Sequence, residues 1–156
     1  MSLGTTTLEG LVRAAIATVF DPEYPGVSVV ELGLLQSVAV ETDGEVRIGM
    51  IPTYSGCPAL KFIAADVETA VGAVAGVSSV RVDWLRSPVW SQDRVAHSAI
   101  KHLEREFTVT LRRADGTLRC PVCGSDAVKD TSLMGPSRCR SLAYCPSCQN
   151  PIEVMR

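Results

Sequence analysis

Histidine and the aromatic residues are scarce in this sequence. Only two of its 156 residues are histidine, and phenylalanine, tryptophan and tyrosine together make up 5%. His97 and His102 are five positions apart, so on a helix they point in different directions and do not form a two-histidine metal site. No histidine lies near the cysteine motif described below, which leaves a thiol-dependent enzyme without a nearby general base.

The sequence also lacks a strong charge bias and a long apolar run. Its net charge is -2, which gives no electrostatic reason to expect nucleic acid or an anionic membrane as a partner. No apolar segment is long enough to span a bilayer, and no secretory signal is recognisable, so we expect a cytoplasmic protein. In that reducing compartment the six cysteines are expected to serve metal binding or thiol chemistry and not disulfides.

The spacing of the apolar residues predicts an α/β (α+β) fold. Apolar residues recur at helical spacing over residues 8–19, 60–74 and 95–103, and residues 34–41, 46–50 and 80–84 have the patterns of strands. Asp43 and Gly44 predict a tight hairpin turn between the first two strands. The expected order is α-β-β-α-β-α, a small mixed sheet flanked by helices. This domain is assigned to residues 5–112 and a smaller module to residues 113–156.

Cys57 lies in the turn between the second predicted strand and the second predicted helix. Pro58 suits the first turn of a helix, because its missing N–H would have had no partner there. Cys57 would then lie near the positive end of the helix dipole, which favours the thiolate. The alternative is a small buried residue without chemistry, since cysteine is among the most buried residue types.

Two Cys-x-x-Cys pairs stand in the C-terminal segment, formed by Cys120 with Cys123 and by Cys145 with Cys148. Four thiolates in this arrangement can hold one tetrahedral ion, and zinc is favoured over iron. The segment from residue 118 onward shows too little apolar material for a core, so we expect it to need the ion in order to fold. Cys139 is left over as a fifth, exchangeable ligand, a reactive thiol or a packed residue.

Three segments together resemble the domain of the iron–sulfur assembly accessory family. They are Asp-Pro-Glu at residues 21–23, the stretch 28–34 with Glu-Leu-Gly at residues 31–33, and Pro-Thr-Tyr-Ser-Gly-Cys-Pro at residues 52–58. The added cysteine module, with Arg-Cys-Arg-Ser-Leu at residues 138–142, is similar to the PaaD (also called PaaJ) type of component of the bacterial phenylacetyl-CoA oxygenase (epoxidase) system. Glu31 departs from the family pattern, in which aspartate is usual at that position.

The resemblance implies roles for particular residues. Cys57 would be the reactive or metal-relaying thiol, with its turn shaped by Thr53, Ser55 and Gly56. Asp21 and Glu23 would be acidic loop residues near it, and the other family-motif positions are Glu31, Trp90 and Asp93. Simpler interpretations stay open: a solvated turn in which Asp21 bonds its own backbone, a cap or salt bridge for Glu31, and a core position for Trp90.

The resemblance further implies an accessory protein without catalytic activity of its own. It would mature or supply an iron centre, with oxygenase or reductase subunits as partners, and a homodimer could share the cargo. The expected cofactors are a structural zinc and transiently bound iron or an iron–sulfur cluster. Three alternatives are a general factor of the Suf type, an enzyme with Cys57 as nucleophile, and a ribbon that binds nucleic acid. The net negative charge argues against the last of these.

Overall fold

Two units make up residues 7–156, the part of the chain that the computed structural model describes. The N-terminal unit contains residues 7–52 and Pro58–Val89, and the C-terminal unit contains Thr53–Cys57 and Trp90–Arg156. The division into separately folding segments 5–112 and 113–156 stays a prediction. No helix within residues 7–156 has the length and apolar character needed to cross a membrane.

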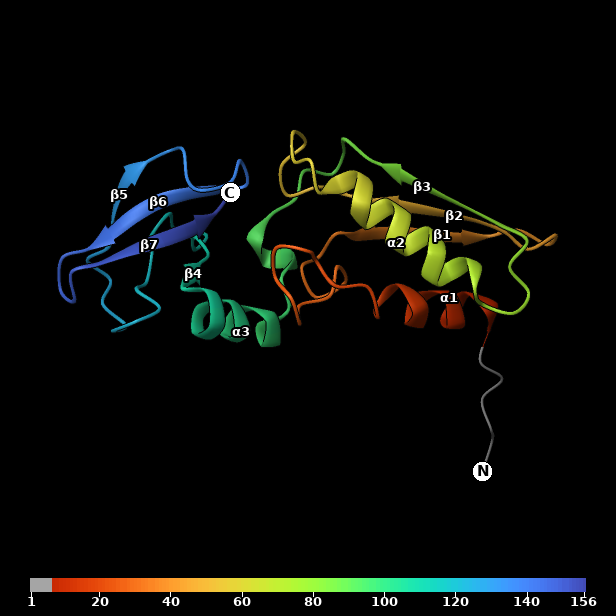
Figure 1. Ribbon diagram of the computed structural model, residues 1–156, viewed down its shortest axis with the longest axis horizontal. Coiled ribbons are helices and arrows are strands. Elements are labelled where there is room, and N and C mark those ends of the chain that lie inside the picture. Colours follow the sequence, from red (N-terminus) through yellow and green to blue (C-terminus); the bar gives the residue numbers. More distant parts are fainter. Residues whose placement is uncertain (1–6) are drawn as a thin grey trace, which may run out of the picture. The chain divides into compact units, whose positions relative to one another are not determined.

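The N-terminal unit is a three-stranded mixed sheet with two helices, as the sequence predicts. Strand β2 is central; it pairs antiparallel with β1 and parallel with β3, and α2 forms the crossover between the two parallel strands. The helices contact each other, α1 also contacts β1, and α2 contacts β3 (Figure 1). The elements are α1 (Leu8–Ile16), β1 (Leu35–Val40), β2 (Glu45–Met50), α2 (Leu60–Gly72) and β3 (Ser79–Trp84).

The core of this unit follows from the alternation in β2. Val46, Ile48 and Met50 are almost fully buried, whereas Arg47 between them is exposed. The helices supply buried residues at helical spacing, namely Val12 and Ile16 of α1 and Ile63, Val67 and Val71 of α2. Burial of one stripe on each helix and one face of a strand is the packing expected of a sheet covered by helices.

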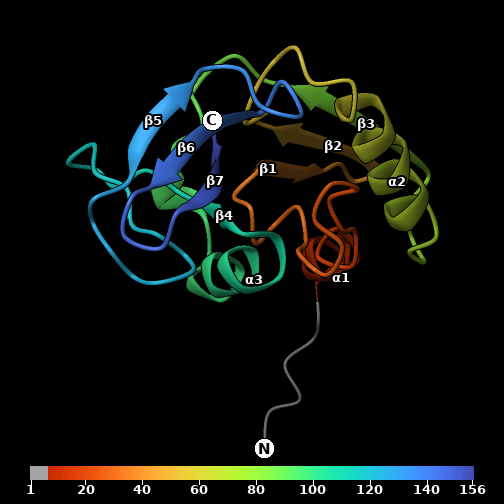
Figure 2. The same cartoon turned by 60° about the vertical axis from the view of Figure 1, so that its left-hand side comes forward.

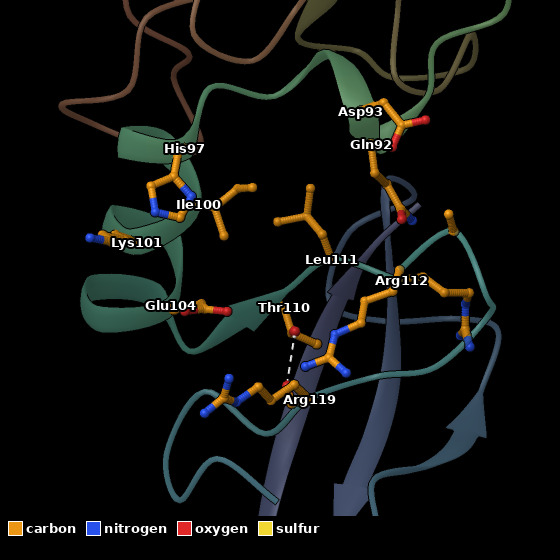
Figure 3. Close-up of a pocket in the computed structure, with 12 residues that line it drawn as sticks. Gln92, Asp93, His97, Ile100, Lys101, Glu104, Thr110, Leu111, Arg112 and Arg119 are labelled. Atoms are coloured by element: carbon orange, nitrogen blue, oxygen red, sulfur yellow. Dashed lines mark hydrogen bonds between the residues drawn. The ribbon is translucent and has the colours of Figure 1, made fainter. Parts of the chain in front are cut away.

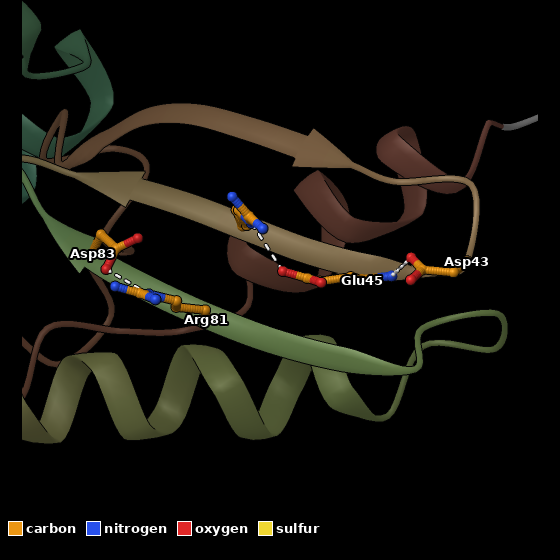
Figure 4. A network of polar contacts seen from close by, with 5 residues as sticks. Asp43, Glu45, Arg81 and Asp83 are labelled. Atoms are coloured by element: carbon orange, nitrogen blue, oxygen red, sulfur yellow. Dashed lines mark hydrogen bonds and ion pairs between the residues drawn. The ribbon is translucent and has the colours of Figure 1, made fainter.

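Charged residues gather on exposed positions of the sheet (Figure 4). The Arg47 guanidinium donates to Glu45 at 2.8 Å, and that of Arg81 donates to Asp83 at 2.9 Å. At the end of the hairpin, the Asp43 side chain accepts a hydrogen bond from the Glu45 N–H at 3.0 Å. Gly44 has φ +86°, a conformation that favours glycine, so the predicted Asp-Gly turn is confirmed.

The C-terminal unit carries a four-stranded sheet in the order β4-β7-β6-β5. The pair β4 and β7 is parallel, while β6 pairs antiparallel with both of its neighbours (Figure 2). A short 3₁₀ helix and α3 precede the sheet in the chain. The bounds are η1 (Gln92–Arg94), α3 (His97–Phe107), β4 (Val109–Thr110), β5 (Lys129–Ser132), β6 (Arg140–Cys145) and β7 (Asn150–Met155).

The C-terminal sheet has a small apolar core of its own, which the sequence pattern does not predict. Ala143, Ile152 and Val154 are buried together with Leu118. Two cysteines, Cys120 and Cys145, complete the buried cluster. The residues that bury apolar surface therefore include prospective metal ligands, so packing and metal binding in this module depend on the same side chains.

Candidate metal centre

Four cysteines of the C-terminal unit converge as their spacing predicts. Their sulfur atoms all lie within 4.8 Å of one another. The Sγ atoms of Cys120 and Cys148 are 3.7 Å apart, and those of Cys123 and Cys145 are 3.6 Å apart. Bonds of about 2.3 Å at tetrahedral angles place neighbouring thiolates about 3.8 Å apart. These two separations are those of a tetrahedral zinc site, and the other pairs lie close enough for the four sulfurs to converge on one ion.

Each cysteine pair is shaped by a tight backbone turn. The N–H of Gly124 donates to the carbonyl of Cys120 at 2.9 Å, and the N–H of Gln149 donates to that of Cys145 at 2.8 Å. Both residues that follow the pairs have positive φ, +77° for Gly124 and +62° for Gln149. The second turn therefore places a non-glycine residue in the left-handed region, which costs free energy that the assembled site must offset.

Hydrogen bonds to the sulfurs favour two of the thiolates. The backbone N–H of Cys148, with further hydrogen bonds from neighbouring groups, lowers the pKa of Cys145 to about 6. The side-chain amide of Asn150, 3.3 Å from the Cys148 sulfur, is the main cause of a lowered pKa for Cys148. Such donors orient the ligands and stabilise their charged form, which is the form that binds metal.

The Cys123 thiol behaves in the opposite way. A backbone hydrogen bond involving Ser125 favours its thiolate, yet desolvation and hydrogen bonding with the other three cysteines raise its pKa to about 12. Without an ion the cluster therefore retains protons, because several adjacent thiolates repel one another. A dication removes this repulsion, and the donor set as a whole fits zinc.

The Cys57 turn, residues Thr53–Cys57, belongs to the C-terminal unit. The Cys57 N–H donates to the carbonyl of Tyr54 at 3.2 Å, and Cys57 is half-buried. A Cβ atom added to Gly56 would lie 3.0 Å from the Tyr54 ring, so the small residue lets the ring fold over the turn. Thr53 is also half-buried and Ser55 is exposed.

The predicted placement of Pro58 in a first helical turn is wrong. Helix α2 begins at Leu60, with Ala59 as its N-cap and no side-chain cap. Pro58 therefore precedes the helix, and Cys57 lies further from the helix start than the sequence pattern indicates. The hydrogen bond from the Cys57 N–H to the Tyr54 carbonyl closes a separate turn before the helix.

The structure places Cys139 away from the four-cysteine cluster. Cys139 immediately precedes β6, whereas Cys145 is the last residue of that six-residue strand. An extended chain advances about 3.3 Å per residue, so the backbone positions of the two residues are about 20 Å apart along the strand. Instead, the Cys139 sulfur lies within 4.8 Å of that of Cys57. Sequence reasoning missed this pairing, because only tertiary structure brings the two positions together.

The acidic motif residues lie in loops of the N-terminal unit. The Asp21 carboxylate accepts a hydrogen bond from the Glu23 N–H at 2.8 Å, and the Asp21 carbonyl accepts one from Tyr24. Glu31 and Ser28 bond reciprocally: the Glu31 carboxylate accepts from the Ser28 N–H at 2.9 Å, and the Ser28 hydroxyl accepts from the Glu31 N–H at 3.1 Å. These bonds order the loops locally, and their proposed metal roles stay predictions.

Asp93 lines a pocket of the C-terminal unit, and Trp90 is buried. The pocket has a volume of about 410 Å³ and lies between α3 and the chain around Thr110, whose hydroxyl donates to the Arg119 carbonyl at 3.0 Å (Figure 3). Its lining mixes charges of both signs, including those of Asp93, Lys101, Glu104, Arg112, Arg113 and Arg119. Because Arg112 and Arg113 also pair with Asp130 and Asp126, the pocket does not define a ligand by charge.

Fold and site together define a two-part protein in which an α/β unit is followed by a four-cysteine ribbon of the zinc type. Residues 10–84 match the family described as "Iron-sulfur cluster assembly protein", and residues 104–156 match the "PaaD zinc beta ribbon domain". The chain belongs to the iron–sulfur cluster assembly family and carries a PaaD-type zinc ribbon, as the motifs predict.

Some similar proteins match only part of this chain, and one matches nearly all of it. An "Fe-S protein maturation auxiliary factor" of Porphyromonas gingivalis is 41% identical over 97 residues, which are 62% of this chain and 90% of that protein. A putative 1,2-phenylacetyl-CoA epoxidase subunit of Escherichia coli is 29% identical over 92% of this chain and 89% of its own length. A solved structure, a domain of unknown function from Bacillus anthracis, has TM-score 0.55 at 32% identity and covers 59% of this chain and 87% of that one.

Proposed function

We propose that this protein is an accessory factor that supplies iron or an iron–sulfur cluster to a multicomponent phenylacetyl-CoA oxygenase. The observation that carries the proposal is the joining of the two modules in one chain. The assembly-type part is shared with general maturation factors, whereas the match to the putative epoxidase subunit of Escherichia coli extends over the ribbon as well.

The residues divide the work in the following way. Cys57 carries the iron or cluster for a short time, because one half-buried thiol offers too few ligands for a stable four-thiolate cluster. The ribbon cysteines hold zinc permanently and give a small sheet the rigidity to dock an oxygenase or reductase subunit. A second copy of the chain would supply further ligands if the cargo is a cluster. Under this proposal the protein has no catalytic activity of its own.

A general maturation factor of the Suf type is the second candidate. It is favoured by the relatives named as auxiliary factors, which match about 60% of this chain. Those relatives account for the assembly-type part but not for the ribbon. The two candidates therefore differ in their clients: one oxygenase system or many iron–sulfur proteins.

The experiment compares clients in one cell. Oxygenase and reductase subunits are expressed in a host that lacks its own PaaD-type protein, with wild-type protein, with Cys57→Ser or with no accessory protein. Iron content of the purified subunits and epoxidation of phenylacetyl-CoA are measured, together with aconitase activity. The proposal expects iron and epoxidation to require the wild type while aconitase stays constant. Equal loss of aconitase activity would instead support a general factor, and full iron loading without the protein would refute both.

A further inference from the structure

We propose that Cys57 and Cys139 together form a second metal site, a two-thiolate clamp for one thiophilic cation such as ferrous iron. The inference rests on the proposed function and names the second ligand that the relay uses. Its starting point is that the two sulfurs lie within 4.8 Å of each other although their residues are far apart in the chain. Two thiolates at about 2.3 Å from one ion are at most about 4.6 Å apart, so little movement closes the clamp.

The contact between the two segments is built from several interactions. The guanidinium of Arg156 lies over the Tyr54 ring, 5.2 Å from its centroid, in the turn that ends at Cys57. The backbone N–H of the same Arg156 donates to the carbonyl of Cys139 at 2.8 Å, and its side chain donates to the carbonyls of Leu133 and Arg138. One residue therefore holds the Cys57 turn and the Cys139 segment together.

The two thiols differ in access, as a relay requires. Cys139 is 5% exposed, and its sulfur lies 3.2 Å from the Ser137 hydroxyl, which fixes its position. Cys57 is half-buried and so is reachable from solvent. A buried ligand that stays in place beside an accessible one allows an incoming partner to attack the ion from the Cys57 side.

The chemistry of binding is a ligand exchange without change of oxidation state. Two sulfur–metal bonds form, two metal–water bonds break, and the two thiol protons pass to solvent. Two thiolates leave part of the coordination shell to exchangeable ligands, whereas the four ribbon cysteines complete theirs. The ribbon is thus a structural site that retains its ion, and the clamp is an open site that releases it to a thiolate of a client protein.

The test uses the full chain with its ribbon already filled with zinc, kept anaerobic and reduced. Ferrous iron is added by equilibrium dialysis, and iron and zinc are counted in the same sample for wild type, Cys57→Ser, Cys139→Ser and the double variant. Ser91→Ala, an exposed position of the same unit, is the matched control. We expect one ferrous ion per wild-type and control chain. Each single variant should lose at least tenfold in affinity, about as much as the double variant, since the thiols act as one site.

A second probe reports the geometry without iron. Phenylarsine oxide reacts with two adjacent thiols. The arsenic atom becomes bound to both sulfurs, and one water molecule is released. After zinc loading, mass spectrometry should find one phenylarsenic adduct on the wild type and the control, and none on either cysteine variant. Retained zinc in every variant shows that the ribbon is still folded, which separates loss of the clamp from loss of the fold.

The outcomes distinguish the clamp from the proposed function. Iron binding that depends on Cys57 but not on Cys139, or the absence of a phenylarsenic adduct on the wild type, would overturn the clamp. If oxygenase maturation still required the protein in that case, the proposed function would stand. Intact binding by both thiols in a protein that does not affect oxygenase iron would refute the function and leave the clamp in place.

Discussion

The guanidinium of Arg156 stacks on the ring of Tyr54, with its central carbon 5.2 Å from the ring centroid. A cation over an aromatic face contributes about 0.5–1 kcal/mol when partly exposed. Because Tyr54 lies in the turn that ends in Cys57, this contact limits how freely the thiol opens to solvent. The accessibility of Cys57 should therefore depend on the stacking of Arg156 on Tyr54.

Replacement of Tyr54 by leucine should loosen the Cys57 turn. We expect the alkylation rate of Cys57 in zinc-loaded protein to rise about two- to fivefold, the change that corresponds to the loss of about 0.5–1 kcal/mol. Mass spectrometry of peptides containing Cys57 measures the rate. Tyr144→Leu, which removes a partly exposed tyrosine from β6, is the control. Identical rates in both variants would show that the stacking does not hold the turn.

Removal of the ribbon metal should unfold the C-terminal sheet selectively. Metal binding by four thiolates is worth on the order of 10 kcal/mol, and the core around Ile152 includes Cys120 and Cys145. Hydrogen exchange after treatment with a chelator should show lost protection in β6 and β7, while β1 and β2, whose core holds no cysteine ligand, stay protected. Unchanged protection of β6 in zinc-free protein would contradict a structural role for the ion.

Asn150 should tune the affinity of the ribbon for its ion. Its amide donates to the Cys148 sulfur and carbonyl, both at 3.3 Å. Loss of an outer hydrogen bond of this kind typically weakens metal binding by roughly tenfold or more. We expect Asn150→Ala to lose zinc to a competing chelator about tenfold more readily than wild type. Lys129→Ala, an exposed change on β5, should match the wild type in the same competition.

Two glycines of the N-terminal unit should respond to alanine with opposite signs. A Cβ at Gly44 would clash with the Gly76 carbonyl oxygen, and φ is +86°, so Gly44→Ala should destabilise the protein by about 2 kcal/mol or more. A Cβ at Gly72, the last residue of α2, would meet nothing within 4 Å. Gly72→Ala should therefore stabilise by up to about 1 kcal/mol. Urea unfolding of the zinc-loaded protein measures both, and equal effects would contradict the geometry of the hairpin.

A partly buried ion pair in the C-terminal sheet should contribute more to the free energy of unfolding than an exposed one. Arg140 and Glu153 lie 2.6 Å apart with side chains 15% and 28% exposed, whereas Arg81 and Asp83 are 72% and 44% exposed. We expect Arg140→Met to cost about 1–2 kcal/mol, because Glu153 is left partly buried without this partner. Arg81→Met should change the free energy of unfolding by less than about 0.5 kcal/mol. A reversed order in urea unfolding would show that burial does not set the strength of these pairs.

The parts of the fold that the sequence predicts are those governed by local patterns. Alternation of Val46, Ile48 and Met50 with Arg47 and Gly49 indicates β2, and the Asp43-Gly44 pair indicates the hairpin; both are observed. The convergence of the four ribbon cysteines is likewise encoded by two short spacings. The strand and the hairpin depend on residues within one element or one turn, where propensity and periodicity act directly, and the two cysteine pairs are recognised by their short internal spacing.

The parts that the sequence does not predict depend on competition or on tertiary contact. Pro58 is compatible with a helix start, but the hydrogen-bonded turn at Tyr54 and Cys57 comes first, and the helix begins only at Leu60. The small core around Ile152 was missed because ligand cysteines supply part of its apolar surface. The approach of Cys139 to Cys57 has no local signature, since it depends on how the segment before β6 meets a distant turn.

Strand β6 has one more consequence. Cys139 precedes its first residue and Cys145 is its last, so the strand separates the Cys139 position from the four ribbon cysteines by about 20 Å. No ion can be shared across that span. If the proposed clamp binds a cation, that cation and the ion of the ribbon are therefore separated by distance, although thiolates would hold both.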